Sequence, residues 1–519
     1  HRIQRMGTRA RRQEHGRRPH RPHRPPRTAH QIRGPLLPKR TRPHDQITNT
    51  TQTGSGRYRT PCGKPAAYTA EKHRSQSGRQ LAKTHTELAP RLILIDKYDY
   101  IFYAALALLP VDGTVIGIRM PYWSPISPIL FLCYVCLNWR LLHTAARPYL
   151  GFMLFPITVL LPLSAFAWST YHFRLITTIT TALGILGFLS CLLSLHIAFS
   201  IKKLSTSFAA SIIGVAYWVA FVVGVIEFLA LRLDIHNLRS YFAHLMLRPY
   251  NRPQFLFAEP SYIGMHVFGV LLPTYWMTKN KRLRTLVFTF IIGSFLMGSG
   301  LRIIIDSAIA CVLWALPHIK FNSRRNRLIT IGGAASLIAA TALVLSFNER
   351  AANIIHHGLI GGDGSMSARI FHAFVLARAW ASDVPRFLIG FGAGNIPTVV
   401  NAHFKSAHQD WNAIGGRNSW EINNLNTPTY NQFTMSGYTS FITEFGILAF
   451  IIFIMLVIIH ISINDAWNKK SVCWFILVAY LYIQFEGYAF YALPLYIWGM
   501  HNTLSSHPIA HIACGLRKV

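Results

Sequence analysis

The chain has 519 residues, of which 51% are hydrophobic and only 14% are charged. Soluble proteins average about 25% charged residues, so this composition excludes an ordinary soluble enzyme of the same length. Residues 1–90 hold 21 Lys and Arg against 4 Asp and Glu, and residues 91–519 hold 31 against 15, so the net charge of +33 divides into +17 and +16. The first segment is polar and the second is a succession of long apolar runs. The sequence therefore predicts a basic leader at 1–90, followed at 91–519 by an all-α polytopic integral membrane protein.

The leader at 1–90 contains ten prolines and eight histidines. Such a composition cannot bury enough apolar surface to offset the entropy of ordering, so we expect disorder. One interpretation is an arm that binds anionic lipid or nucleic acid. The other is a translated stretch that is not native protein, because Met6 is the only methionine before Met120. The leader lacks the aromatic-rich or folded pattern of a nucleic-acid-binding domain, so we expect no nucleic-acid partner.

The cysteines predict neither a disulfide framework nor a metal site. Five of the seven lie within apolar runs, and only Cys62 and Cys514 fall outside them. Cys133 and Cys136 have the spacing of a redox motif, but they lie in an apolar stretch without a soluble α/β context. We interpret them as small apolar side chains.

From Tyr100 onward, apolar runs recur at lengths that suit membrane-spanning helices of about 20 residues. They predict eleven spans and a short twelfth, at 100–118, 121–139, 149–170, 175–200, 208–231, 261–278, 285–298, 303–319, 328–346, 437–461, 471–487 and 488–501. Fourteen Lys and Arg fall in five short connectors, at 140–148, 201–206, 279–284, 320–327 and 462–470. These connectors lie on one side if each span crosses once, and the positive-inside rule assigns that side to the cytoplasm.

The opposite, outer side receives the long segment 347–436, which is too long for a simple connection and is therefore predicted to be functional. The basic residues predicted on this side are twelve arginines and one lysine, Lys405. The arginines are Arg119, Arg174, Arg232, Arg239, Arg248, Arg252, Arg302, Arg350, Arg369, Arg378, Arg386 and Arg417. Because the planar guanidinium binds phosphate through two parallel hydrogen bonds, the excess indicates a phosphate-bearing ligand. A genomic preference for arginine codons would give the same excess.

Two segments near the predicted outer face carry candidate chemistry. Glu259 and Pro260 open the sixth span, which is either ordinary helix capping or a carboxylate held at the membrane surface beside Arg252. Arg302 follows a tight glycine-rich turn and precedes Asp306 by four residues, so the two charges can pair on a helix. If they pair fully they neutralise each other; if Asp306 is satisfied elsewhere, Arg302 is available to a ligand.

The long outer segment contains a predicted helix that follows Gly364 and continues to about Trp380. Ser365 or Ser367 would cap this helix, which would present Arg369 and His372 on one face. Those side chains are the first candidates in the segment for contact with a ligand.

Further along the same segment, Gly390, Gly392 and Gly394 alternate with other residues. Such a run lets backbone amides approach an anion, although the strand-turn-helix context of a nucleotide-binding fold is missing. His403 and His408 follow in a polar region, where each is either a general base or a solvated loop residue.

Taken together, four elements resemble the O-antigen polymerase and ligase superfamily of bacterial inner-membrane glycosyltransferases. They are the segment Phe257–Gly264, the pair of Ser367 and Arg369, the run Gly390–Gly394, and the segment Thr443–Ile447 that opens the next span. The resemblance covers roughly residues 95–500, and the large outer loop before the last helices also matches in position. The Glu-Pro-Ser element is more similar to polysaccharide polymerases than to ligases.

This resemblance implies a glycosyltransferase that uses neither metal nor cofactor and polymerises repeat units carried on undecaprenyl pyrophosphate. The product would be O-antigen, capsule or exopolysaccharide, made on the outer face of the bacterial inner membrane. The expected partners are the lipid-linked glycan, membrane lipid, a chain-length regulator and a flippase. Two alternatives stay open, an O-antigen ligase and a transporter or flippase of an anionic glycolipid. The internal repeats typical of transporters are not visible in the sequence.

The implied chemistry assigns roles to particular residues. Cations must stabilise the leaving pyrophosphate, and a base must accept the proton of the attacking hydroxyl. The expected catalytic residues are Glu259, Arg302, Arg369, His408 and His403. The expected substrate-binding residues are Arg252, Ser261, Ser367, Gly390, Gly392 and Gly394.

Overall fold

The structure, a computed structural model, describes residues 96–115, 126–171, 173–246, 251–318, 324–346, 349–426, 435–485 and 487–502. The chain divides into two units, His1–Ala89 and Pro90–Val519, and all described residues belong to the second. The predicted leader therefore lies outside the described residues. Every regular element in the described stretches is helical, apart from one isolated bridge between Thr114 and Met246.

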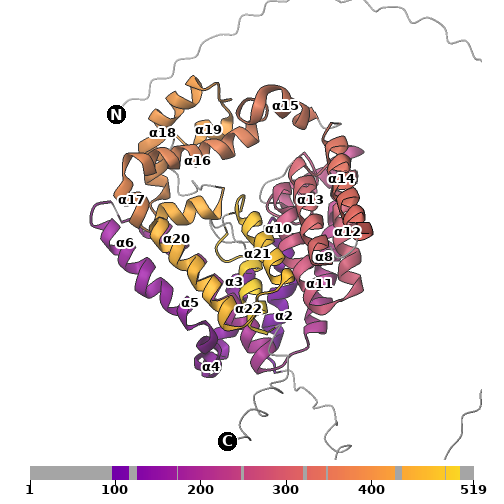
Figure 1. Ribbon diagram of the computed structural model, residues 1–519, viewed down its shortest axis with the longest axis vertical. Coiled ribbons are helices and arrows are strands. Elements are labelled where there is room, and N and C mark those ends of the chain that lie inside the picture. Colours follow the sequence, from indigo (N-terminus) through magenta and orange to yellow (C-terminus); the bar gives the residue numbers. More distant parts are fainter. Residues whose placement is uncertain are drawn as a thin grey trace, which may run out of the picture. The chain divides into compact units, whose positions relative to one another are not determined.

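The first half of the described chain forms long apolar helices (Figure 1). Its elements are α2 (Asp99–Ala107), η1 (Leu109–Val111), α3 (Ile126–Leu137), η2 (Trp139–Leu141), α4 (Leu142–Ala146), η3 (Arg147–Tyr149), α5 (Leu150–Phe155), η4 (Pro156–Leu160), α6 (Leu161–Trp168), α7 (Leu175–Leu195), η5 (His196–Ile201), α8 (Thr206–Arg232) and α9 (His236–Leu245). The elements from η2 to α6 follow one another directly as a single helical run.

The second half adds further helices against the first and a group at one end. Its elements are η6 (Pro260–Tyr262), α10 (Ile263–His266), η7 (Val267–Leu271), α11 (Leu272–Thr278), α12 (Lys281–Leu296), α13 (Leu301–Ala315), η8 (Leu316–His318), α14 (Arg324–Ser346), α15 (Glu349–Gly361), α16 (Gly364–Ser382), α17 (Val384–Ile389), α18 (Ile396–Ala413), α19 (Trp420–Asn424), α20 (Gly437–Ile463), α21 (Lys469–Tyr482) and α22 (Ala492–Asn502).

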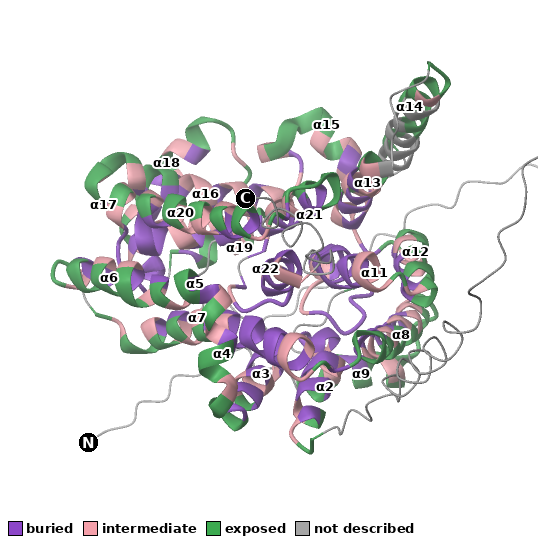
Figure 2. Cartoon of the chain, turned by 60° about the horizontal axis from the view of Figure 1, so that its bottom comes forward, coloured by how far each residue is buried: buried purple, intermediate pink, exposed green. Residues whose placement is uncertain are grey.

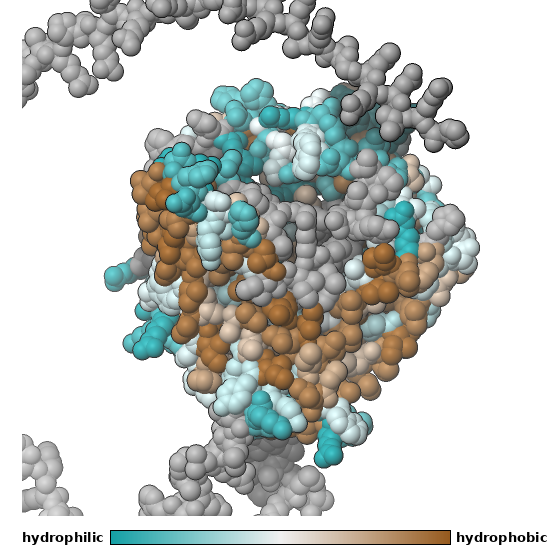
Figure 3. Space-filling view, turned by 180° about the vertical axis from the view of Figure 1, so that it is seen from behind, coloured by the Kyte–Doolittle hydropathy of each residue, from teal (hydrophilic) through white to brown (hydrophobic). Residues whose placement is uncertain are grey.

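Four helical runs are long and apolar enough to cross a membrane: Trp139–Trp168, Leu175–Ile201, Thr206–Arg232 and Gly437–Ile463. On α8, the side chains of Val215, Val219, Val222 and Ile226 recur every three or four residues and are 41–65% exposed. An exposed apolar stripe along a helix suits lipid rather than water. Figure 3 shows a broad apolar region between more polar ends. The prediction of an all-α polytopic membrane protein is confirmed.

Several predicted spans are shorter or interrupted helices. The span predicted at 100–118 contains α2, which ends at Ala107, and Pro110 then lies in the 3-10 turn η1. The span predicted at 261–278 is divided by η7, a single π-helical turn. The predicted twelfth span becomes α22, which is buried among the other helices rather than facing lipid (Figure 2). Apolar runs could not separate these cases because a buried core helix and a lipid-facing helix are equally hydrophobic.

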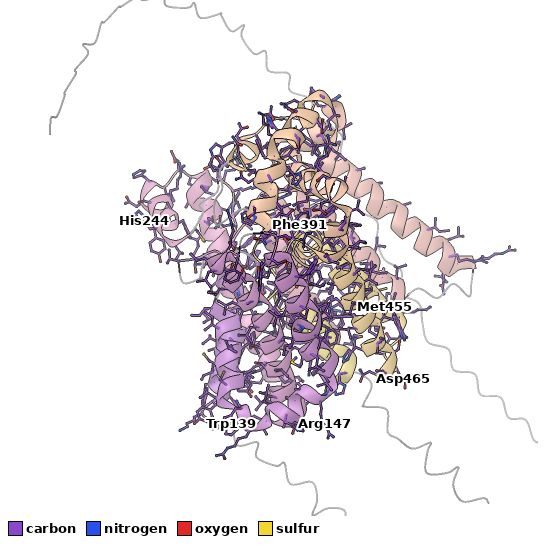
Figure 4. All side chains as sticks on the ribbon, turned by 90° about the vertical axis from the view of Figure 1, so that its left-hand side faces the viewer. Trp139, Arg147, His244, Phe391, Met455 and Asp465 are labelled. Carbon is purple, nitrogen blue, oxygen red and sulfur yellow. The ribbon has the colours of Figure 1, made fainter. Side chains whose placement is uncertain are left out.

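Different segments of the chain lie at the two ends of the long helices. Figure 4 places Trp139, Arg147 and Asp465 at one end and His244 at the other. In the segment predicted to be functional, 347–436, residues 349–426 form α15–α19, and α16–α18 pack on α20 at the second end (Figure 1). These helices have a core of their own, formed by Phe371, Val375, Val399, Phe404, Trp411 and neighbouring apolar side chains. We call this second end the site end.

Candidate functional site

A cleft lies at the site end, between α15–α16 and the ends of α13 and α21. It encloses about 610 Å³, part of which is open to solvent. Four arginines line it: Arg252, Arg302, Arg350 and Arg369. They come from separate parts of the chain, because Arg252 precedes η6, Arg302 lies in the first turn of α13, and the other two belong to α15 and α16. We call it the arginine cleft.

Arg302 is held on two sides. Its Nη1 donates a hydrogen bond to the backbone oxygen of Gln484 at 3.0 Å, and its Nε lies 3.4 Å from Oδ2 of Asp306. The side chain is only 10% exposed, so little conformational freedom remains to be lost when a ligand binds. The four-residue spacing left open whether Asp306 pairs with Arg302 or is satisfied elsewhere, and the structure places the two side chains together.

Glu259 lies beside the second predicted cation. Nη2 of Arg369 is 3.8 Å from Oε2 of Glu259, and the Ser261 hydroxyl donates a 2.8 Å hydrogen bond to the same oxygen. The two charged side chains are 22% and 21% exposed, so water and a ligand can reach them. Pro260 opens η6, and Glu259 precedes it with extended backbone at φ −149° and ψ 152°. The carboxylate is therefore placed at a helix start beside a cation, where it is partly exposed.

Arg350 was not singled out by any motif. Its Nε and Nη2 donate to the two oxygens of Asp363 at 3.0 and 2.6 Å, which is the bidentate geometry of a strong ion pair. Asp363 also accepts from the Met366 amide and so caps α16. Burial raises the pKa of Asp363, but the Arg350 hydrogen bonds, the Met366 amide and the nearby cations outweigh it, and the pKa is below its ordinary value. The expectation that Ser365 or Ser367 caps this helix is wrong.

Arg252 approaches the start of α13 closely. A Cβ on Gly300 would lie 3.1 Å from Nη1 of Arg252, and Gly300 has φ +150°. Glycine at this position therefore allows the guanidinium to reach the turn. Counting formal charges, four arginines face Glu259, Asp306 and Asp363, which gives the cleft and its immediate neighbours a net charge of +1. Carboxylates pair with Arg302, Arg350 and Arg369, and the excess charge favours an anion.

The two predicted histidines lie on α18, away from the arginine cleft, and neither contributes to its lining. His408 Nε2 is 2.9 Å from Oδ1 of Asn418, and its ring stacks on Phe404. Burial lowers the pKa of His403, while the charge of Asp383 opposes this effect. Ser367 is buried and donates to the backbone oxygen of Arg417 at 2.6 Å. The structure does not bring these three residues together with Glu259 and Arg302.

The last glycine of the run, Gly394, binds a carboxylate of the chain itself rather than a ligand. The Gly394 amide donates to Oε1 of Glu444 at 2.8 Å. The hydroxyls of Thr181 and Tyr488 donate to the same carboxylate at 2.8 and 3.1 Å, and Glu444 is fully buried. This arrangement leaves no room for a substrate phosphate at Gly394.

Gly390 and Gly392 fit against a break in α20. The Phe391 and Gly392 amides donate to the backbone oxygens of Thr443 and Glu444 at 2.8 and 2.9 Å. Those carbonyls are available because α20 is kinked at Gly446, which has φ +82°. The run therefore joins the α15–α19 group to a membrane helix.

A larger cavity, of about 1000 Å³, lies between α5, α7, α20 and α21. Its lining is almost wholly apolar and includes Phe155, Phe188, Phe453 and Tyr482, with no charged residue. Such a cavity offers packing but no acid, base or cation, whereas the arginine cleft gathers both cations and an acid. Among the described residues, no three His, Cys, Asp or Glu side chains are placed to hold a metal ion.

Of the predicted site residues, the structure brings Arg252, Ser261, Arg302 and Arg369 to one cleft, with Glu259 in contact with two of them. Sequence reasoning missed Tyr480 and Gln484, which also line it. Tyr480 lies inside an apolar run and gives no motif. The sequence feature that indicated Arg350 was its place among the arginines predicted on the outer side.

Comparison with known proteins does not assign the chain to a family. No protein-family model matches the chain, and no curated protein matches it significantly.

Proposed function

We propose that this chain is a membrane-embedded glycosyltransferase that polymerises oligosaccharide repeat units carried on undecaprenyl pyrophosphate. The observation that supports the proposal is the convergence of Arg252, Arg302 and Arg369, together with Glu259, from segments up to 117 residues apart (369 − 252). The sequence context of each residue predicts it as a site residue. A cleft lined by arginines, with the Glu259 carboxylate in contact with Arg369 and Ser261 of its lining, suits a reaction with an anionic leaving group and a hydroxyl nucleophile.

The proposed step exchanges one glycosidic bond for another. A sugar hydroxyl of the acceptor attacks the anomeric carbon of the donor, and the bond from that carbon to the pyrophosphate oxygen breaks. The pyrophosphate leaves with the bonding electron pair, and Arg302 and Arg369 stabilise its negative charge. The hydroxyl proton passes to the Glu259 carboxylate. Glu259 is favoured over His403 and His408 because it contacts two residues that line the cleft, Arg369 and Ser261.

The position of the cleft suits an outer-face reaction. The cleft lies at the site end, whereas Arg147 and Asp465 of the basic connectors lie at the opposite end. By the positive-inside rule the basic connectors face the cytoplasm, so the cleft faces outward. The proposed location is the bacterial inner membrane, crossed several times by the chain.

A ligase would use the same leaving group and differ only in the acceptor. The arginine cleft therefore supports transfer from a lipid pyrophosphate in either case, and the polymerase assignment rests on the Glu-Pro-Ser element at 259–261. A transporter needs neither a base nor a fixed set of cations at one end, so the geometry favours it least.

The proposal is tested by the surface-glycan ladder of cells that lack the gene. Complementation with the wild-type gene should restore the ladder, whereas Arg302→Ala and Arg369→Ala should not, at equal protein levels in the membrane. Arg239→Ala is the matched control, because Arg239 pairs with exposed Asp234 and lies outside the cleft. Single repeats still attached to the acceptor in the deletion strain indicate a polymerase. Full-length chains that accumulate on the lipid carrier indicate a ligase, and an unchanged ladder contradicts both.

A further inference from the structure

Asp306 is a buried carboxylate directly behind the arginine cleft. It lies one helical turn after Arg302 in α13 and has no exposed surface. Its Oδ1 accepts a 2.6 Å hydrogen bond from the hydroxyl of Tyr480 on α21, and its Oδ2 lies 3.4 Å from Nε of Arg302. A Cβ on Gly264 of α10 would lie only 1.9 Å from Oδ2, so the α10 backbone packs directly on the carboxylate. Three helices therefore meet at this one group.

Stability alone does not account for Asp306. Burying a carboxylate costs hydration, and a buried ion pair is often no more stable than apolar residues of the same shape. Oδ2 of Asp306 and Nε of Arg302 form no hydrogen bond of good geometry with any described residue, so this pair is weaker than a bidentate one. An apolar side chain at position 306 would pack against Gly264 without that cost. The carboxylate is therefore better explained by what it does to Arg302.

The contacts of Arg302 define which of its donors are left for a ligand. Nε faces Asp306, and Nη1 is used by the Gln484 backbone oxygen. Nη2 takes part in no interaction with the described residues, and Arg302 lines the cleft. Tyr480 and Gln484 line the cleft as well. Tyr480 lies in the last turn of α21 and Gln484 just after it, so this short stretch contacts Arg302 directly through Gln484 and indirectly through Asp306.

We propose that Asp306 and Tyr480 are positioning residues that fix Arg302 so that Nη2 is presented to the pyrophosphate of the donor. Tyr480 holds the Asp306 carboxylate through its hydroxyl, and Asp306 in turn orients the Arg302 guanidinium. This inference rests on the proposed function of the arginine cleft and adds two residues to it. It explains why a tyrosine hydroxyl and a carboxylate are found together in an otherwise apolar part of the helices.

The test uses the full chain in lipid nanodiscs and inorganic pyrophosphate as the probe, with chelator present. Binding is measured by calorimetry for the wild type, Asp306→Asn and Tyr480→Phe. Tyr482→Phe is the matched control, because Tyr482 lies two residues further along and lines the apolar cavity instead. Each substitution is then repeated in an Arg302→Ala background, and the melting temperature of every variant is recorded.

Positioning and structural support give different results in this double-mutant cycle. We expect Asp306→Asn and Tyr480→Phe each to weaken pyrophosphate binding about tenfold, the loss typical of one hydrogen bond to a charged group. In the Arg302→Ala background the same substitutions should change binding less than twofold, and Tyr482→Phe should have no effect in either background. Tyr480→Phe removes one oxygen atom and keeps the ring, so it tests the inference even if Asp306→Asn fails to fold.

Three outcomes would overturn the inference. Equal losses in the Arg302 and Arg302→Ala backgrounds would show that Asp306 and Tyr480 support the fold rather than Arg302. Unchanged binding in both variants, with a wild type that binds pyrophosphate, would reject the inference and leave the proposed function intact. Absence of binding by the wild type would reject the pyrophosphate site itself and, with it, both proposals.

Discussion

The arginine cleft and the glycine–Glu444 contact are two places where hydrogen-bond donors gather around a carboxylate, and they differ in access. Glu444 is fully buried and accepts from Thr181, Gly394 and Tyr488. Glu259 is 21% exposed in its side chain and contacts Arg369 at 3.8 Å. One carboxylate is enclosed by its donors, and the other is partly exposed beside a cation.

The difference separates structural support from chemistry. An enclosed and satisfied anion stabilises the contact between two parts of the fold, and no ligand can reach its donors. A partly exposed carboxylate beside a partly exposed arginine can exchange contacts with a substrate. We therefore predict that substitutions at the glycine–Glu444 contact mainly reduce folding, and that substitutions at the cleft mainly reduce turnover.

The largest effect is expected for Gly390→Ala. Gly390 has φ +90°, and a Cβ there would lie 2.3 Å from the backbone oxygen of Glu444. Strain and overlap together should cost about 3 kcal/mol or more, so little folded protein should be recovered in fluorescence-detected gel filtration. Gly415→Ala is the control, since Gly415 has φ +76° with no atom within 4 Å of an added Cβ, and it should cost only about 1 kcal/mol. Equal recovery of the two variants would contradict the structural role of the glycine run.

Glu259→Gln should remove most activity without loss of folded protein. The amide has the same shape as the carboxylate and can still accept from Ser261, but it cannot take a proton. Loss of a general base lowers kcat about 100-fold or more, with KM nearly unchanged. His403→Gln and His408→Gln should retain activity within about twofold, since both lie on α18 and, unlike Glu259, do not contact the arginines or Ser261 of the cleft lining. If a histidine substitution lowered kcat more than Glu259→Gln does, the general base would instead be assigned to α18.

Arg369→Lys should give an intermediate loss. Lysine keeps the charge beside Glu259 but lacks the fork that can bind two phosphate oxygens. We expect roughly tenfold lower kcat/KM than the wild type, compared with about 100-fold for Arg369→Ala. Identical rates for the lysine variant and the wild type would mean that charge alone is sufficient.

The smallest effect concerns the corner between α15 and α16. The pKa of Asp363 is below its ordinary value of 3.8 because Arg350 and the Met366 amide hold the carboxylate ionised. A carboxyl group with a lowered pKa adds stability above its ordinary pKa, and this contribution disappears as the pH falls through the folded-state pKa. Asp363→Asn should therefore melt below the wild type at pH 7, with a difference that shrinks below about pH 4. A difference independent of pH would assign the loss to the cap alone.

Local patterns predicted much of the fold and part of the site. The apolar runs predicted the long helices, and the four-residue spacing showed that Arg302 and Asp306 can pair. The patterns could not show that Gly394 would meet Glu444, because the two are 50 residues apart and their contact depends on a kink at Gly446. They also misplaced the histidines, since the side chains on one long outer segment need not share one surface. Tyr480 gave no signal because a tyrosine in an apolar run is usually packing.

The most direct measurement of the central claim is turnover by the purified protein. The chain would be reconstituted in liposomes with a labelled repeat unit on undecaprenyl pyrophosphate, in the presence of chelator. The account predicts products of two or more repeats, one undecaprenyl pyrophosphate released for each bond formed, and loss of both with Arg302→Ala. Donor that stays intact, or that only moves between leaflets, would contradict it.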